Sequence, residues 1–295
     1  MTPSSDLAGM WYWAIPLWQG RLATMEERLD GGNAGGAVRV GDTVRRARGP
    51  WTPAVHALLS HLAGKGFAGV PRPLGVDGRG REILTFLEGQ TVGSVLPWPG
   101  WAYAEDTLAD VARWLRGYHT AVADFIPPPG AVWRLGAQWH RGQVIGHNDA
   151  APYNAVWRAG RLAGFIDWDM AGPADPEWDV AFAAFGWVPL HARHVAVREG
   201  FTEFSSRPRR LRRFLAEYGW SGTMLGFLDV LRAQVGAHTA RVRALAAAGD
   251  PLFARLARQG VADNLDIALA ELDQINPRTQ PTRRPALSSV GCPLS

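Results

Sequence analysis

The stretch of sequence that decides the fold lies in the middle of the chain and reads Val144-Ile145-Gly146-His147-Asn148-Asp149-Ala150-Ala151-Pro152-Tyr153-Asn154-Ala155-Val156-Trp157. Its apolar ends predict buried strands, and the polar residues between them predict a connecting loop. The second strand continues into a hairpin, because Ala159-Gly160 predicts a turn before residues 161–166, and this hairpin leads to Asp167. Buried strands that place polar side chains at one end are typical of a functional site.

Three oxygen-bearing side chains in this region, Asp149, Asn154 and Asp167, have the chemistry that phosphoryl transfer requires. That reaction needs a carboxylate that orients the attacking hydroxyl group and accepts its proton, oxygen ligands for Mg²⁺, and a cation beside the phosphates. Magnesium prefers hard oxygen ligands, which an amide and a carboxylate both offer. We therefore predict that Asp149 is the catalytic base and that Asn154 and Asp167 are metal ligands. The alternative for each residue is an ordinary role in a turn or a hairpin.

The residues on the N-terminal side of this region predict a small, mostly antiparallel sheet with one helix. Apolar residues alternate around a turn at Gly41-Asp42, which predicts a hairpin. A proline at its start and a glycine at its end predict a short helix over residues 53–64. Two further strands are predicted over residues 70–76 and 81–87, joined by a turn that contains glycine.

The residues on the C-terminal side predict mainly helices. Apolar residues recur at helical spacing from Glu105 to Tyr118, and again over residues 207–276. Residues 277–295 are rich in Pro, Thr, Arg and Ser without any periodicity, which predicts a disordered tail. The expected layout is a small β-rich lobe, a short connection and a larger helical lobe.

The composition of the 295 residues, with 47% hydrophobic and 20% charged residues, is that of an ordinary globular protein. A net charge of +4 suits anionic ligands such as nucleotides, and it is too small to indicate nucleic acid by itself. The single cysteine, Cys292, excludes an internal disulfide. The apolar segment 10–18 is too short to span a bilayer and lacks a basic segment before it. We expect it to pack on the protein or on a partner, with an interfacial membrane anchor as the alternative. We expect a soluble cytoplasmic protein.

The spacing His147-x-Asp149-x-x-x-x-Asn154, followed by a hairpin into Asp167-Trp168-Asp169, resembles the phosphotransferase family that includes aminoglycoside phosphotransferases and choline kinases. The resemblance is strongest over residues 144–182 and covers roughly residues 28–275. It implies an α+β, two-lobed protein-kinase-like fold with a small antiparallel β-rich N-lobe and a larger helical C-lobe. The expected segments are an N-terminal extension over 1–20, a nucleotide-binding N-lobe over 21–90, a catalytic and acceptor-binding C-lobe over 91–276, and the tail over 277–295.

The resemblance also implies an activity. A member of this family moves the γ-phosphate of ATP or GTP to a hydroxyl group of a small molecule with the help of Mg²⁺, so we expect a nucleotide and a small-molecule acceptor as partners and no nucleic acid. Asp179 is expected to brace the catalytic loop, with contact to the substrate as the alternative. His147 is expected to have a structural role, with transfer of a proton as the alternative. For Asp169, a role next to the metal ligands and a solvent-facing position both remain open.

Two segments of the first lobe resemble nucleotide-binding parts of the family. Gly31, Gly32 and Asn33 resemble the glycine-rich turn over the phosphates, where the backbone approaches phosphate without interference from Cβ atoms. Phe86 and Leu87 resemble the hinge whose backbone hydrogen-bonds the base.

The cation that contacts phosphate departs from the family pattern. The strand after the glycine-rich turn carries Arg45 and Arg46 where the family has a lysine, and the one lysine of the chain, Lys65, lies beyond the helix. Arg45 fits the lysine position best, Arg46 is the alternative, and arginine binds phosphate through two hydrogen bonds. The helix also lacks the glutamate that pairs with this cation, and His56 is its nearest polar candidate. These departures support an alternative function, a kinase-like binding protein without turnover.

The acceptor is less clearly indicated than the reaction. Clustered carboxylates suit cationic aminoglycosides, whereas the C-terminal part of this chain carries a run of arginines, Arg207, Arg209, Arg210, Arg212 and Arg213. We expect this run to form a solvated helix face, with binding of an anionic substrate or of nucleic acid as the alternatives. "Aminoglycoside" is therefore a family name here, and a neutral or anionic acceptor is at least as well supported.

Overall fold

The structure is a computed structural model of the chain, and it describes residues 26–29, 36–93 and 96–272. Several predicted features lie outside the described residues: Gly31, Gly32 and Asn33, the apolar segment 10–18, and the tail 277–295.

The first lobe is built on a five-stranded antiparallel sheet with the strand order β1-β2-β3-β5-β4. The strands are β1 (Glu27–Arg28), β2 (Val38–Val40), β3 (Thr43–Arg46), β4 (Pro73–Val76) and β5 (Glu82–Thr85). The hairpin predicted around Gly41-Asp42 is confirmed, because Val40 pairs with Thr43 across the turn. The two predicted strands that follow the helix form in shorter versions as β4 and β5.

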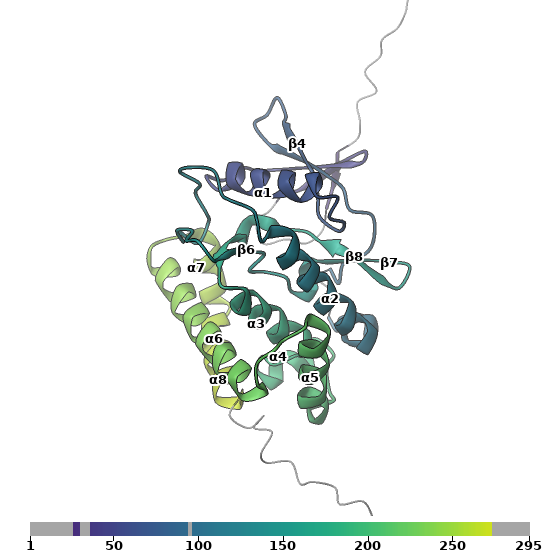
Figure 1. Cartoon of the computed structure of the whole chain (residues 1–295), viewed down its shortest axis with the longest axis vertical. Helices are drawn as coiled ribbons and strands as arrows, with labels where there is room; N and C mark the ends of the chain where they lie inside the picture. The colour runs from purple at the N-terminus through teal and green to yellow at the C-terminus, as the bar shows by residue number, and fades with distance from the viewer. Residues whose placement is uncertain (1–25, 30–35, 94–95, 273–295) are drawn as a thin grey trace, which may run out of the picture.

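The predicted helix forms as α1 (Thr52–Gly64), which lies beside the sheet (Figure 1). Its apolar residues recur three and four positions apart, so that one stripe of the helix is buried. Leu58, Leu59 and Leu62 in this stripe are inaccessible to solvent. The helix therefore packs on the core through its leucines, and its polar face, with His56, remains available for the contacts described below.

The second lobe contains the hairpin and the set of helices that the sequence predicts, together with a further two-stranded sheet (Figure 1). Strands β6 (Val144–Gly146) and β9 (Gly172–Ala174) form an antiparallel pair, and β7 (Ala155–Arg158) and β8 (Arg161–Phe165), which lie between them in sequence, form the hairpin. The helices are α2 (Glu105–Val122), α3 (Pro176–Trp187), α4 (Arg193–Arg198), α5 (Arg207–Tyr218), α6 (Met224–Ala247), α7 (Pro251–Arg258) and α8 (Val261–Leu272). Short 3-10 turns connect several of them, at Gly100–Tyr103, Pro152–Asn154, Trp168–Met170 and Phe204–Ser206.

One hydrophobic core joins the two lobes. Leu58 of α1 and Leu84 of β5 belong to the same cluster of buried side chains as Leu115 of α2 and Trp187 of α3. This shared core fixes the sheet of the first lobe relative to the two-stranded sheets of the second lobe. Within the described residues, none of the helices is long and apolar enough to cross a membrane.

A pair of glycines brings the two lobes into direct backbone contact. The N–H group of Phe165 donates to the carbonyl of Gly69 over 2.9 Å, next to Gly164 with a φ of 154°. A Cβ atom on Gly164 would lie 2.1 Å from the carbonyl oxygen of Gly69, which no side chain tolerates. Strand β8 is therefore held at a fixed place against the first lobe, just before Asp167.

The arginine run of α5 is only partly a solvated face, so the prediction is wrong for two of its residues. Arg207 and Arg210 are buried, and they donate to the backbone carbonyls of His191 and Trp187 over 2.9 and 3.0 Å. Arg209 is exposed, and its Nη1 lies 2.9 Å from Glu105 on α2. Arginine has five donors and a long apolar stem, which suits it to bridging helices in this way.

Candidate active site

The loop between β6 and β7 is held in place by a buried carboxylate from α3. Asp179 accepts hydrogen bonds from the backbone N–H groups of His147 and Asn148 over 3.1 and 2.7 Å, and from Nε2 of His119 over 2.9 Å. Burial by itself opposes the charged form, yet the bond from His119 and the loop amides keep the pKa of Asp179 below its ordinary value. The predicted bracing role of Asp179 is confirmed by these contacts.

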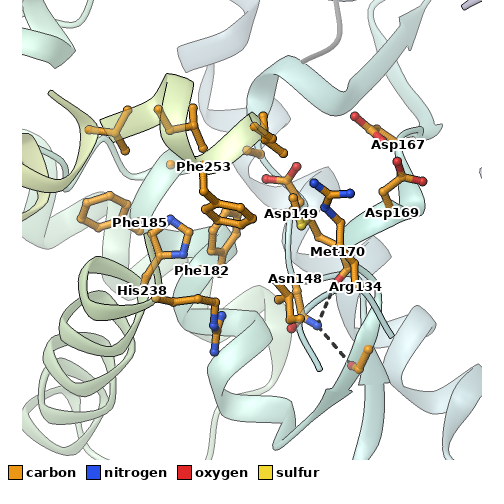
Figure 2. Close-up of a pocket in the computed structure, with 18 of the residues that line it drawn as sticks. Arg134, Asn148, Asp149, Asp167, Asp169, Met170, Phe182, Phe185, His238 and Phe253 are labelled. Atoms are coloured by element: carbon orange, nitrogen blue, oxygen red, sulfur yellow. Dashed lines mark hydrogen bonds between the residues drawn. The ribbon is translucent and has the colours of Figure 1, made fainter. Parts of the chain in front are cut away.

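Asn148 adds a second tie to this loop. Its backbone has a φ of 58°, in the left-handed region that asparagine tolerates better than most residues. Its side-chain amide donates to the carbonyl oxygens of Met170 and Gly172, each over 3.1 Å, as the dashed lines in Figure 2 show. The loop is thus fixed on both sides before it reaches Asp149.

Asp149 is gripped by two neighbours in the same loop. Its Oδ1 accepts a hydrogen bond from the Tyr153 hydroxyl over 2.7 Å, and its Oδ2 accepts one from Nδ2 of Asn154 over 2.8 Å. Because the nitrogen of the Asn154 amide faces Asp149, its oxygen remains available to another ligand. Burial raises the pKa of Asp149 to about 8, and the nearby negative charge of Asp167 adds to the increase.

Asp167 follows β8 and adopts a φ of 60°, a left-handed conformation that is uncommon for residues other than glycine. Its carboxylate and that of Asp169 are both held by Arg46 of β3. The Arg46 Nη1 lies 3.0 Å from Oδ1 of Asp167, and Nη2 lies 2.6 Å from Oδ1 of Asp169. The position of Asp169, open on sequence alone, is beside the predicted metal ligand.

The structure places Arg46 at this site and Arg45 elsewhere, which reverses the order in which the sequence ranked them. Arg45 donates to the hydroxyl of Thr43 over 2.6 Å on the other face of the strand. Neighbouring residues of a strand point to opposite faces, so a one-residue error in the pattern selects the wrong arginine. Burial would lower the pKa of Arg46, but Asp169, Asp167 and Glu82 outweigh this effect and raise it.

The glutamate that the helix lacks is replaced by Glu82 of β5, which sequence analysis missed. Glu82 is 1% exposed and lies directly opposite Arg46 in the sheet. Its Oε1 accepts a hydrogen bond from Nε of Arg46. Its other oxygen lies 2.7 Å from Nε2 of His56 on α1. A charged residue at a buried position of an apolar strand was the available signal. The helix therefore contacts the cation through His56 and Glu82.

A cavity of about 1110 Å³ opens in front of these groups, lined by Asp149, Asp167 and Asp169. Figure 2 shows the three carboxylates along one side of it and the rings of Phe182, Phe185 and Phe253 along the other. Phe182 and Phe185 belong to α3 and Phe253 to α7, and residues of α6 complete this wall.

The two hinge candidates do not line this cavity. Phe86 and Leu87 contribute instead to a second pocket of about 280 Å³ together with Gly69 and Ala163. The N–H group of Phe86 donates to the carbonyl of Asp42 over 2.9 Å, so it is already used within the protein. Their contact with the base stays a prediction.

The residues fit a magnesium ion that is shared with a phosphate ligand. The described residues contain no cluster of three or more His, Cys, Asp or Glu side chains that would hold a metal by itself. Asp167 and the free oxygen of Asn154 offer hard oxygen ligands, and magnesium commonly takes one or two protein ligands with phosphates and water completing the shell. This donor set suits a metal that arrives with a nucleotide.

Comparisons with known proteins agree with this arrangement. Residues 130–218 match the model of the phosphotransferase enzyme family. The trifolitoxin immunity protein of Rhizobium leguminosarum bv. trifolii is 38% identical over 209 residues, which are 69% of this chain and 78% of that protein.

Solved structures of kinases share the fold at low sequence identity. An amicoumacin kinase in complex with AMP-PNP and Ca²⁺ superposes with a TM-score of 0.55 at 10% identity, covering 85% of this chain and 89% of that one. A choline/ethanolamine kinase family protein from Mesorhizobium loti superposes with a TM-score of 0.51 at 16% identity, covering 88% and 96%. An aminoglycoside phosphotransferase in complex with GDP and kanamycin superposes with a TM-score of 0.51 at 15% identity, covering 87% of this chain and 94% of that one. The expected protein-kinase-like fold is confirmed.

Proposed function

The chain belongs to the phosphotransferase enzyme family, and on that premise we propose that it transfers the γ-phosphate of ATP or GTP to a hydroxyl group of a small molecule. The observation that carries the proposal is that Asp149 and Asp167 line one cavity large enough for an acceptor, while Asn154 lies next to them with its amide bonded to Asp149. Asp149 and Asn154 come from the segment between β6 and β7, and Asp167 follows β8. Residues of these strands belong to the shared core.

Asp149 acts as the base in this proposal. One of its oxygens accepts the proton of the attacking hydroxyl as the new oxygen–phosphorus bond forms and the bond to the departing nucleoside diphosphate breaks. Tyr153 and Asn154 hold the carboxylate in one orientation, so the acceptor finds a fixed partner. The ionised form is needed for this step, so kcat/KM is expected to increase as the pH rises toward about 8.

Asn154 and Asp167 would hold Mg²⁺, which supplies positive charge that neutralises the phosphate oxygens when it is bound. Arg46 would contact phosphate, since it is fixed at the same place by Glu82 and already faces Asp167. A buried guanidinium that is fully charged suits this role better than a mobile surface cation. Asp169 keeps Arg46 aligned from the other side.

The relationship to an immunity protein favours a second candidate, a kinase-like protein that binds its ligand without turnover. Protection against a toxic compound needs only that the compound is removed, and binding achieves this as well as phosphorylation does. The ion pairs of Arg46 with Asp167 and Asp169 are compatible with this candidate, because they satisfy the carboxylates without a metal.

A coupled assay for release of ADP or GDP separates the two candidates. The protein is incubated with Mg²⁺ and either nucleotide across a library of hydroxylated metabolites and antibiotics, and each hit is checked by mass spectrometry for the gain of one phosphate group. We expect acceptor-dependent release that disappears when Mg²⁺ is chelated. Hits that bind, as seen by thermal shift, without any release of diphosphate would favour the binding protein and contradict the transferase.

A further inference from the structure

Helix α6 presents three polar side chains to the cavity at helical spacing. Gln234, His238 and Arg241 lie four and three positions apart, so they share one face of the helix, and all three line the cavity. Gln234 is only 8% exposed. Within the described part of the chain, none of the three has a hydrogen bond or an ion pair to another residue. Buried polar groups normally have hydrogen-bond partners, so a ligand in the cavity would supply the partners that these three side chains lack among the described residues.

Arg241 gives the stripe a positive charge, which suits an anionic ligand. Burial lowers the pKa of His238 to about 4, and the charge of Arg241 nearby lowers it further, so the imidazole is neutral at physiological pH. Burial also lowers the pKa of Arg241, and no carboxylate of the described residues forms an ion pair with it. A partly buried guanidinium without a counter-ion is stabilised by a ligand that brings one.

The carboxylates of the cavity outside the catalytic loop offer little to a polycation. Asp250 is the N-cap of α7 and accepts hydrogen bonds from the backbone N–H groups of Leu252 and Phe253. Glu199 lies 2.6 Å from Nε2 of His191. Asp175 is exposed at the start of α3. Asp250 and Glu199 thus have partners inside the protein, and Asp167 and Asp169, which also line the cavity, are paired with Arg46. The described residues therefore do not form a dense cluster of free acids.

The remaining wall is aromatic. Phe182, Phe185 and Phe253 line the cavity together with His238, and Figure 2 shows them on the opposite side from Asp167 and Asp169. The ring of His238 packs edge-on against Phe182 with 5.8 Å between the ring centroids. Flat apolar rings bind an aromatic or apolar body, and a few polar groups set its orientation.

We propose that the acceptor is a hydroxyl-bearing molecule with an aromatic or apolar body and a carboxylate, and that Gln234, His238 and Arg241 bind its polar end. The proposal rests on the proposed function only where it calls this molecule the acceptor. The binding of its carboxylate by Arg241 does not depend on whether the protein transfers phosphate. A polycationic sugar is the ligand class that this wall disfavours, because its charge meets Arg241 and it lacks an apolar face.

The test uses the full-length protein and two matched probes, N-acetyl-seryl-tryptophan as the free acid and as its C-terminal amide, with kanamycin as the polycation. Dissociation constants are measured by ligand-observed NMR in the presence of Mg²⁺ and ADP or GDP. The free acid is expected to bind about tenfold or more tightly than the amide, because a hydrogen-bonded charge pair contributes at least that much. Kanamycin is expected to bind more weakly than the acid.

The variant Arg241→Gln is expected to reduce the acid-to-amide ratio to about threefold or less, and Arg241→Lys to preserve most of it. Arg243→Gln is the matched control on the same helix, because Arg243 is exposed and pairs with Asp266 on α8 over 2.6 Å. It should leave the ratio unchanged. A ratio that survives Arg241→Gln in a protein with an unchanged melting temperature, or tighter binding of kanamycin than of the acid, overturns the proposal.

Measurement of phosphate transfer in the same samples keeps the two proposals apart. Selective binding of the acid without transfer of phosphate to any library compound would support the ligand class and contradict the transferase function. Transfer to kanamycin without selective binding of the acid would do the reverse.

Discussion

Replacing Asp149 with asparagine is expected to lower kcat for phosphoryl transfer by a factor of about 10² to 10⁴, the usual contribution of a general base. Asparagine keeps the size of the side chain, but it has no charge with which to accept the proton of the acceptor hydroxyl. The increase of kcat/KM toward pH 8 should disappear with it, since that increase reports ionisation of the same carboxyl group. Steady-state kinetics with the best acceptor from the library screen measures both effects.

The matched control for this variant is Asp229→Asn. Asp229 is exposed on α6 and pairs with Arg232 on the next turn, over 3.1 Å, so its loss should leave kcat within a factor of about two. Circular dichroism and thermal melting check that both variants are folded. A folded Asp149→Asn protein with wild-type turnover would remove Asp149 from the mechanism.

Replacing Asp179 with alanine is expected to lower the free energy of unfolding by about 3–5 kcal/mol, the usual effect of removing one partner from a buried charged network. Asp179 is inaccessible to solvent, and its loss leaves Nε2 of His119 and two backbone N–H groups of the catalytic loop without an acceptor. Urea unfolding followed by fluorescence measures the change. The equivalent control, Asp229→Ala, should change stability by no more than about 0.5 kcal/mol.

The contribution of Asp179 also has a definite pH dependence. Its pKa is lowered in the folded protein, so its stabilising effect is fully present above the unfolded pKa of about 3.9 and is lost as the pH falls through the folded value. The difference in stability between the wild type and Asp179→Ala should therefore narrow in acid. A difference below about 1 kcal/mol at neutral pH would show that the loop does not depend on this carboxylate.

Local spacing made the proximity of Asp149, Asn154 and Asp167 predictable from the sequence. Asp149 and Asn154 lie five positions apart in one loop, and Asp167 follows the next hairpin, so a single short segment contains all three. The helix and hairpins of both lobes were also predictable, because each depends on a repeating apolar pattern and on nearby turn residues. The predicted layout of two lobes follows from the same patterns.

The features that escaped prediction depend on pairing between distant segments. Glu82 meets Arg46 only because β3 and β5 are neighbours in the sheet, and the choice between Arg45 and Arg46 depends on which face of β3 meets the second lobe. The stripe of α6 is brought to the catalytic loop by the packing of α3 against α6. Helical spacing alone does not tell a buried face that lines a cavity from one that packs in the core.

The direct test of the account is a thermal-shift titration with Mg-ATP and Mg-GTP on the wild type and on Asp167→Asn. At about a hundred times the dissociation constant, bound nucleotide should raise the Tm of the wild type by roughly 5 °C. We predict this increase with at least one nucleotide, its loss when Mg²⁺ is chelated, and its loss in a folded Asp167→Asn protein. An equal increase without magnesium, or in Asp167→Asn, would contradict a metal–nucleotide site built on Asn154 and Asp167.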